Sequence, residues 1–260
     1  MSFLRLSFIP VYVSSPVAEL GESSMLIGGA TMYLKPDEPW PTCATCAHPL
    51  VPLLQLNASS EATPSSFRTL IPSPTPAKGA RMLATMVQLF VCPEGDCYDT
   101  STGYSTNTRS WVVRIATVPV SPSADTPYWA EARAKIEEGN GFLPARVVEG
   151  WAIGKKETLD QELLWGQDDS EEFYAAHEPE PGLKLLGHTV RGKYFCSDRE
   201  CPRAGTHEHP SRRELIQLGD LHCDWEEDEA LGMMATLGNA WIEQCVDHPE
   251  VLTLSMSGNW

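Results

Sequence analysis

Residues 43–46 read Cys-Ala-Thr-Cys and residues 92–97 read Cys-Pro-Glu-Gly-Asp-Cys, and these two stretches decide the expected fold. Two close cysteine pairs at the mouths of turns, far apart in sequence, let a chain present four thiolates to one tetrahedral zinc ion. We therefore predict a first zinc site with the ligands Cys43, Cys46, Cys92 and Cys97. Four thiolates fill the tetrahedral shell, so such a site contributes to folding and leaves the metal no open position for catalysis.

Other interpretations of these cysteines remain open. In a secreted chain they would pair as disulfides, and otherwise they could be free, buried thiols. A thioredoxin-type redox pair is disfavoured because that motif opens a helix, whereas Cys46 is followed by Ala47-His48-Pro49, which cannot continue one.

A second cysteine pair opens a second predicted site in the later part of the chain. Residues 195–201 read Phe-Cys-Ser-Asp-Arg-Glu-Cys. By analogy with the first site, its second pair of ligands should come from a later strand. This predicts a zinc site formed by Cys196, Cys201, Cys245 and His248. The competing ligands are His207, His209 and Cys223, and the choice among them stays open.

Short motifs recur in the same order around the two cysteine pairs. Residues 24–29, Ser-Met-Leu-Ile-Gly-Gly, precede the first pair, and residues 53–56, Leu-Leu-Gln-Leu, follow it. Residues 183–188, Leu-Lys-Leu-Leu-Gly-His, precede the second pair, and residues 215–218, Leu-Ile-Gln-Leu, follow it. The shared order of strand, glycine turn, metal knuckle and strand predicts a duplication. The two glycines of the first turn are expected to serve the backbone rather than a ligand.

The remaining patterns predict an α+β fold: a β-rich pseudo-repeat of two halves with zinc knuckles and two short helices. Apolar or alternating runs between turn formers predict strands near residues 6–13, 25–34, 50–56, 83–91, 111–118, 142–153, 183–195, 214–218, 240–245 and 251–256. One helix should be capped by Thr126, start with Pro127 and end at Gly139, and a short acidic helix should cover residues 168–177. Residues 57–78, rich in Ser, Thr and Pro, predict a long loop.

Negative charge is concentrated in the second half of this 260-residue chain, whose net charge is −16. Residues 1–125 carry 7 basic and 9 acidic side chains, whereas residues 126–260 carry 12 and 26. The Pro/Ser-rich connector near residue 122 predicts a β-rich half over 1–122 and an α+β half over 123–260, which could also form one continuous domain. The acidity disfavours nucleic-acid binding and favours a basic protein partner.

The chain contains no apolar run near the roughly 20 residues that a membrane-spanning helix needs. Its apolar N-terminus is a poor signal peptide, because Arg5 lies inside the apolar stretch and Pro10 interrupts it. We therefore expect a cytoplasmic protein without membrane contact, with secretion left open. The oligomeric state is not predicted.

The first-half motifs resemble those of the YwqG-like family of proteins of unknown function. The resemblance rests on Leu26-Ile27-Gly28-Gly29, on Trp-Pro-Thr-Cys-Ala-Thr-Cys at residues 40–46, on Pro49-Leu50 and on Leu54-Gln55-Leu56. In the second half, a Trp-containing strand at 147–153, the turn at Leu186-Gly187 and Gly-Asn-Ala-Trp-Ile at 238–242 are similar to the family pattern.

The first half is also similar, more distantly, to the programmed-cell-death-protein-two family. It shares the Gly-Gly turn, Cys-x-x-Cys, the Leu-Gln strand and a later Phe-x-Cys…Cys pair before a Trp strand, here residues 90–97 and 111–113. Members of that family act as chaperones for a newly made ribosomal protein. The resemblance implies a zinc-stabilised binding scaffold.

Three functions are compatible with the sequence. The first is a non-enzymatic zinc-stabilised scaffold, chaperone or adaptor for a basic protein partner. The second is a lectin-like protein that binds glycans through its aromatic side chains. The third is a zinc hydrolase in which His207, His209 and Cys196 hold the metal with one open position and Glu208 acts as the base. No P-loop, dinucleotide fingerprint or nucleophile elbow is present.

Overall fold

The computed structural model describes ten strands and two helices in part of the chain. The described residues are 5–12, 25–35, 38–72, 83–94, 97, 110–119, 127–139, 141–157, 182–187, 212–218 and 239–257. The strands in these residues are β1 (Arg5–Tyr12), β2 (Met25–Ile27), β3 (Val51–Asn57), β4 (Leu83–Val91), β5 (Trp111–Pro119), β6 (Arg146–Glu157), β7 (Leu183–Leu186), β8 (Arg212–Leu218), β9 (Asn239–Cys245) and β10 (Leu252–Ser257). The helices are α1 (Ser65–Arg68) and α2 (Pro127–Glu138).

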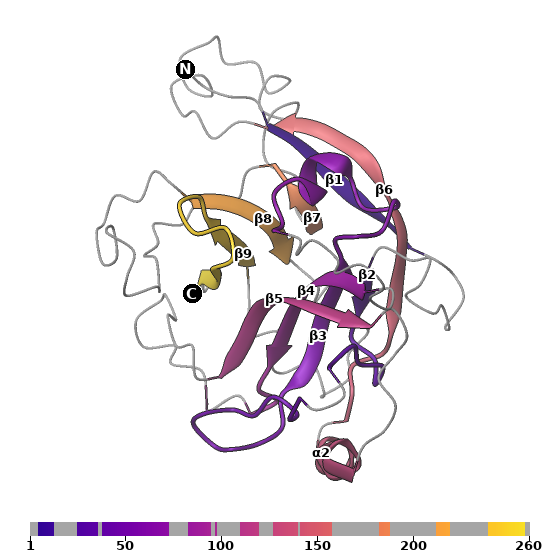
Figure 1. Ribbon diagram of the computed structural model, residues 1–260, viewed down its shortest axis with the longest axis vertical. Coiled ribbons are helices and arrows are strands. Elements are labelled where there is room, and N and C mark those ends of the chain that lie inside the picture. Colours follow the sequence, from indigo (N-terminus) through magenta and orange to yellow (C-terminus); the bar gives the residue numbers. More distant parts are fainter. Residues whose placement is uncertain are drawn as a thin grey trace.

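These strands form one curled sheet, shown in Figure 1. Its order is β10-β9-β8-β7-β1-β6-β2-β3-β4-β5, and the paired neighbours are antiparallel. The sheet curls until its two edge strands, β10 and β5, lie close to each other. It is therefore nearly closed, which leaves little exposed strand edge.

The strand order is symmetric about the central pair β1–β6. Reading outward from β6 gives β2, β3, β4 and β5, and reading outward from β1 gives β7, β8, β9 and β10. Each strand of the first half thus has a counterpart in the second half at the same distance from the centre. The predicted two-half pseudo-repeat and β-rich α+β class are confirmed.

The repeat extends to the register of individual residues. Leu26 lies opposite Gln55 between β2 and β3, as Lys184 lies opposite Gln217 between β7 and β8. The turns that follow β2 and end β7 also match. Gly28 and Gly29 have φ angles of 62° and 77°, and residues 186 and 187 have 57° and 82°. The left-handed backbone explains the predicted glycine turn, because glycine has no Cβ and adopts this conformation most readily.

The two halves exchange their first strands. Strand β1 precedes β2 in sequence but pairs with β7 of the second half. Strand β6 precedes β7 but pairs with β2 of the first half. The exchanged strands pair with each other from Arg5↔Glu157 to Tyr12↔Val148. Each half therefore completes the sheet of the other.

One large apolar cluster contains residues from both halves. It includes Met25 and Ile27 of β2, Leu185 of β7 and Ile242 of β9. Leu26 belongs to a second, smaller cluster, because side chains alternate between the two faces of a strand. The shared core and the exchanged strands make the two halves interdependent.

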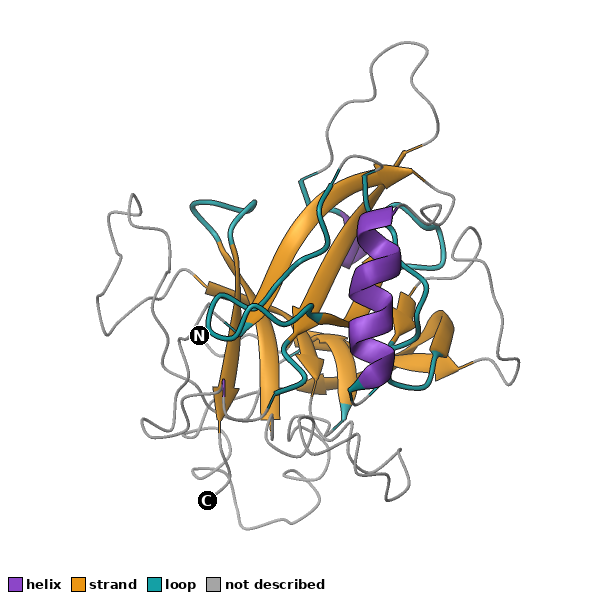
Figure 2. Ribbon diagram, turned by 90° about the horizontal axis from the view of Figure 1, so that it is seen from below, coloured by secondary structure: helices purple, strands orange, loops and turns teal. Residues whose placement is uncertain are grey.

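Helix α2 lies along one side of the sheet (Figure 2). It begins at Pro127 and is followed by Gly139, as predicted. Its buried side chains are Trp129, Ala132 and Ile136, whose spacing of three and four residues forms one face of a helix. These three side chains join the large apolar cluster.

Several predicted boundaries were wrong. The loop predicted over residues 57–78 contains α1, whose Phe67 is fully buried in the core. The strand predicted over 25–34 ends at Ile27, where the glycine turn begins. The strand predicted over 142–153 is displaced and forms β6. The predicted acidic helix at 168–177 lies outside the described residues, in which neither helix is long and apolar enough to cross a membrane.

Candidate metal centre

The four cysteines of the first predicted site form one cluster. The Sγ atoms of Cys43, Cys46, Cys92 and Cys97 all lie within 4.8 Å of one another. The first two precede β3 and the last two follow β4. Because β3 and β4 are antiparallel neighbours, the start of one and the end of the other lie at the same edge of the sheet.

The sulfur spacing fits a metal bridge. The Sγ atoms of Cys46 and Cys92 are 3.6 Å apart. In a tetrahedral site with Zn–S bonds of about 2.3 Å, two sulfurs are separated by about 3.8 Å. A disulfide would require about 2.05 Å, and all four cysteines are free thiols. Three of the four residues are buried and only Cys46 is exposed, so this cluster can hold a metal ion largely shielded from solvent.

Backbone hydrogen bonds hold the first cysteine pair in a tight turn. The N–H of Cys43 donates to the carbonyl of His48 at 2.8 Å, and the N–H of Ala47 donates to the carbonyl of Cys43 at 2.9 Å. Ala47 has a φ of 59°, a left-handed conformation in which Gly is more usual. The N–H of Thr45 points at the Cys43 sulfur, at 3.4 Å. The turn thus directs a donor toward a sulfur ligand.

The second cysteine pair lies in the connection between β4 and β5. The N–H of Cys92 donates to the carbonyl of Ser110, the residue before β5, at 2.7 Å. The N–H of Cys97 donates to the carbonyl of Glu94 at 3.1 Å. Cys92 is therefore anchored to the sheet, and a local turn brings Cys97 back toward it.

The thiols differ in acidity. Burial raises the pKa of Cys92 well above its usual range and raises that of Cys97 to about 12. Burial also opposes ionisation of Cys43, but the backbone N–H groups of Cys46 and Thr45 outweigh it and lower its pKa to about 7. Metal binding to thiolates must therefore displace protons from Cys92 and Cys97, and the metal affinity should fall as the pH falls.

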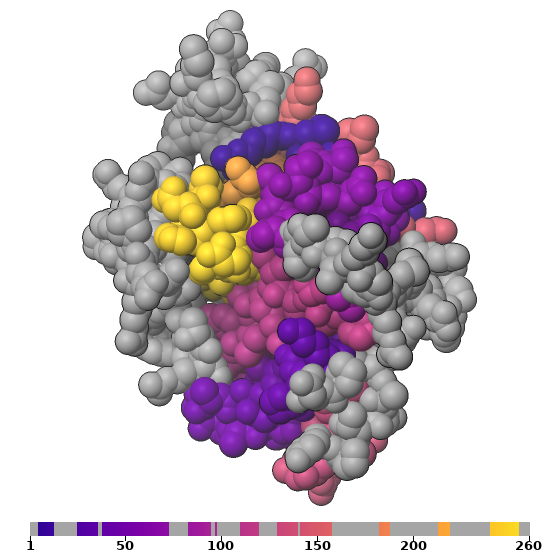
Figure 3. Space-filling model, viewed as in Figure 1, coloured from indigo at the N-terminus to yellow at the C-terminus, as the bar shows by residue number. Residues whose placement is uncertain are grey.

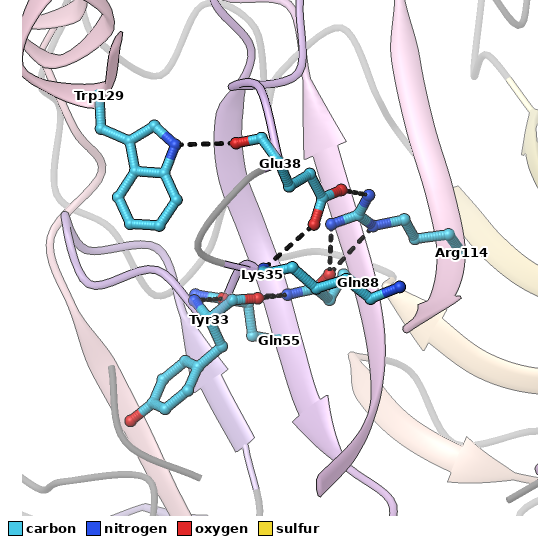
Figure 4. Close-up of polar contacts among 7 residues, drawn as sticks. All are labelled: Tyr33, Lys35, Glu38, Gln55, Gln88, Arg114 and Trp129. Atoms are coloured by element: carbon cyan, nitrogen blue, oxygen red, sulfur yellow. Dashed lines mark hydrogen bonds and ion pairs between the residues drawn. The ribbon is translucent and has the colours of Figure 1, made fainter. Parts of the chain in front are cut away.

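A polar ladder on three strands fixes the segment that leads to the first cysteine pair (Figure 4). Gln55, Gln88 and Arg114 lie opposite one another on β3, β4 and β5. Arg114 Nε donates to Gln88 Oε1 at 3.0 Å, and Gln88 Nε2 donates to the carbonyl of Tyr33 at 2.7 Å. Gln55 Oε1 accepts the N–H of Tyr33 at 3.1 Å. Side chains of the sheet thus bind both the N–H and the carbonyl of Tyr33.

Glu38 links this ladder to α2. Its carboxylate forms an ion pair with Arg114, and its carbonyl accepts a hydrogen bond from Trp129 Nε1 at 3.1 Å. Two residues later, Trp40 Nε1 donates to the carbonyl of Leu50 at 2.8 Å. The chain is therefore fixed to α2 and to the sheet immediately before the first cysteine pair. These positioning residues were not predicted as part of the site.

The structure describes two of the four predicted ligands of the second site. The Sγ of Cys245, at the end of β9, lies 3.7 Å from Nδ1 of His248. Cys196 and Cys201 lie outside the described residues, as do the competing ligands His207, His209 and Cys223. The complete second site stays a prediction.

Cys245 occupies the place that Cys92 has in the first half. Cys92 directly follows β4 and Cys245 is the last residue of β9, and these are each the third strand outward from the central β1–β6 pair. The N–H of Cys92 donates to the carbonyl of Ser110, and that of Cys245 donates to the carbonyl of Val251 at 3.2 Å. Ser110 and Val251 are each the last residue before the edge strand of their half. Cys245 is therefore the structural counterpart of Cys92, and its role as a metal ligand stays a prediction.

The proposed hydrolase residues His207, Glu208 and His209 lie outside the described residues, so that hypothesis stays a prediction. Comparison of the chain with protein-family models and with curated proteins gave no match. The family resemblances drawn from the motifs likewise stay predictions.

Proposed function

We propose that this protein is a non-enzymatic binding scaffold whose first half is stabilised by a structural zinc ion. The observation that carries the proposal is the cluster of Cys43, Cys46, Cys92 and Cys97. Four sulfurs from the protein complete a tetrahedral shell, so a bound zinc ion has no position left for water or substrate. Tetrahedral thiolate sites favour zinc or iron–sulfur chemistry, and zinc is the ion without redox activity.

The ion would cross-link two connections of the first half. Cys43 and Cys46 belong to the segment held by the polar ladder, and Cys92 and Cys97 belong to the connection after β4. A metal bound only in the folded state adds its binding free energy to the stability of that state. The polar ladder and the metal would thus together fix the 38–50 segment against β3 and β4.

The partner that fits the charge distribution is a basic protein. Residues 126–260 carry 26 acidic and 12 basic side chains. Such an excess attracts positively charged partners and speeds their association at low salt. The resemblance of the first half to a family of ribosomal-protein chaperones supports the same class of partner.

The zinc proposal is tested by elemental analysis of protein purified under reducing conditions. We expect at least one tightly bound zinc per chain, and Cys46→Ser should lose one. Ala44→Ser is a matched control, because it places a hydroxyl in the same exposed turn and leaves the sulfurs intact. Iron in place of zinc, or equal zinc in the two variants, would contradict the proposal.

The partner proposal is tested by affinity capture from lysate at moderate salt, with an unrelated acidic protein of similar net charge as the control. We expect basic proteins that are enriched over the control and released at high salt. Recovery of the same proteins by the control would show non-specific attraction. Signal on a glycan array without protein capture would favour the lectin-like alternative.

A further inference from the structure

A cavity of about 460 Å³ opens between β1, the end of β7, the start of β8 and the segment of α1. Leu6 and Phe8 of β1 and Leu186 of β7 provide its apolar walls, and Arg5, Arg213 and Glu214 provide its charged walls. In the space-filling view, β1 (indigo), β8 (orange) and the α1 segment (purple) border one another on the same face (Figure 3). Cavities of about 300–1,000 Å³ with apolar walls and a few polar groups are the usual sites for small molecules.

The corresponding place in the first half is filled with core side chains. Both β3 and β8 contain an irregularity at the same position, between Pro52 and Leu54 and between Glu214 and Ile216. Val51 directly precedes Pro52 in the first half, and Arg213 directly precedes Glu214 in the second. Val51 is 1% exposed and belongs to the apolar core. An arginine that lines a cavity therefore stands where the first half has a buried valine.

The exchanged strands show the same substitution. Arg146 lies opposite Ile27 as Phe8 lies opposite Leu185, so Arg146 and Phe8 are counterparts. Three residues before each of them are Leu143 and Arg5. Leu143 is 3% exposed, whereas the Arg5 side chain is 43% exposed. A second core position of the first half has thus become an arginine at the cavity.

The turn after β7 has changed in step with these two positions. A Cβ on Gly28 would lie 2.9 Å from Leu143 Cβ and 2.7 Å from the carbonyl oxygen of Pro144. Leu186, the counterpart of Gly28, has the same left-handed backbone but carries a full side chain that lines the cavity. The differences at these three positions accompany an open, amphipathic space beside β7 and β8, at a place where the described part of the first half has buried core residues.

The described residues that line the cavity carry one net positive charge, from Arg5, Arg213 and Glu214. Arg5 Nη1 pairs with Glu214 Oε2 at 3.1 Å, and the Glu214 side chain is 18% exposed. In the described part of the chain, Arg213 has no ion pair. A positively charged site stands out in a chain of net charge −16 and is complementary to a monoanion.

We propose that this cavity binds a small molecule with an apolar body and one carboxylate. Arg213 contacts the carboxylate, and Leu6, Phe8 and Leu186 contact the apolar body. Arginine suits this role because its planar guanidinium donates two parallel hydrogen bonds to a carboxylate. None of the described lining residues is a proposed zinc ligand.

The test is calorimetric titration of the full chain with octanoate, below its micelle concentration, and with octan-1-ol and octyltrimethylammonium as probes of equal chain length. We expect octanoate to bind at least about ten times more tightly than either, the factor that about 1.4 kcal/mol from a charged hydrogen bond supplies. Equal binding of the three probes, or no binding of octanoate, would overturn the proposal.

Variants locate the binding. Arg213→Gln should raise the Kd for octanoate about tenfold and leave that for octan-1-ol unchanged. Glu214→Gln should lower the Kd for octanoate, because it removes a negative charge, the one acidic side chain among the described lining residues. Ser66 is an exposed residue of α1 that lines the cavity. Ser66→Phe should therefore weaken the binding of both octanoate and octan-1-ol, because the larger side chain fills the cavity without disturbing the core.

Lys135→Gln is the charge-matched control, since Lys135 lies on α2 and its side chain is 55% exposed. It should leave the octanoate Kd unchanged. Each variant is first shown to unfold at the wild-type temperature or close to it. An octanoate Kd that changes equally in Arg213→Gln and Lys135→Gln, or in neither, would show that the cavity does not recognise the carboxylate.

Discussion

The two halves of the molecule share a backbone plan but differ in the side chains that fill it. Phe90 and Val91 near the end of β4 are fully buried apolar residues, whereas their counterparts on β9 are Glu243 and Gln244. Strand pairing and left-handed turns are in the same places in both halves. The pairing persists because ladder hydrogen bonds join main-chain groups, which every residue except proline carries in full. The comparison shows that a duplicated sheet can keep its register while one copy replaces core residues with polar ones.

A second difference between the described parts of the two halves is a buried ion pair in the second half. Lys184, the counterpart of Leu26, is fully buried, and its Nζ lies 2.8 and 2.7 Å from the two carboxylate oxygens of Glu157. A Cβ on Gly187 would collide with that carboxylate, so the glycine leaves the space that Glu157 occupies. The apolar position of the first half has thus become a charged position with a dedicated partner.

The strongest test of the repeat compares Cys92→Ser with Cys245→Ser. In the first half, loss of a ligand from the proposed closed zinc site should cost at least about 5 kcal/mol or prevent folding, because structural zinc contributes about 10–16 kcal/mol in zinc-finger peptides. If Cys245 is also a ligand, its variant should lose one zinc and a comparable amount of stability. The measurements are zinc per chain and the midpoint of denaturant unfolding. A Cys245→Ser protein with full zinc content would limit the metal to the first half.

The next test gives the second half the residue of the first. Lys184→Leu leaves the buried Glu157 carboxylate without its lysine, and we expect a loss of about 3–5 kcal/mol in the free energy of unfolding. The double variant Lys184→Leu with Glu157→Leu should recover most of that loss, since buried ion pairs replaced by apolar residues are often no less stable. Urea unfolding of the three proteins measures both effects. A single variant as stable as the wild type would mean that the pair contributes little.

The features that the sequence predicts are those with local signatures. The four-cysteine cluster follows from two short spacings, and the repeat follows from motifs that stay in order along the chain. The exchange of β1 and β6 has no such signature. The sequence of a strand predicts that it is a strand, but does not say whether it pairs with β2 or with β7. Likewise, nothing in the local sequence pairs Glu38 with Arg114, which are brought together only by the order of the strands.

Helix α1 was missed for a different physical reason. Its stretch is rich in Ser, Thr and Pro, which predict a loop, and the helix has only four residues. One apolar side chain, Phe67, decides the outcome, because its burial fixes the segment against the core. Gln244 Nε2 on β9 also donates to the carbonyl of Leu70 at 2.8 Å, so the second half helps to hold it. Tertiary contact overrides composition here.

A smaller test addresses the polar ladder of the first half. Gln88→Leu removes the donor to the Tyr33 carbonyl, which is a buried hydrogen bond, and the acceptor for Arg114, which is part-buried. We expect a loss of about 1–3 kcal/mol, the usual effect of leaving a buried polar group unsatisfied. If the ladder positions the first cysteine pair, the zinc affinity should fall as well, measured by competition with a chelator. Unchanged zinc affinity with reduced stability would assign the ladder to folding alone.

The smallest expected effect distinguishes a strained turn from a relaxed one within the first cysteine pair. Ala47 has a φ of 59° and is exposed, so its methyl group adds left-handed strain without contributing to the core. Ala47→Gly should therefore stabilise the protein by about 1 kcal/mol, the usual penalty of a left-handed L-residue.

Ala44→Gly, in the same exposed turn but without a positive φ, is the matched control and should be neutral or slightly destabilising, because glycine only adds freedom to the unfolded chain there. Thermal unfolding of the zinc-bound protein measures both. Equal shifts of the unfolding temperature in the two variants would mean that the left-handed conformation of Ala47 does not limit the stability of the protein.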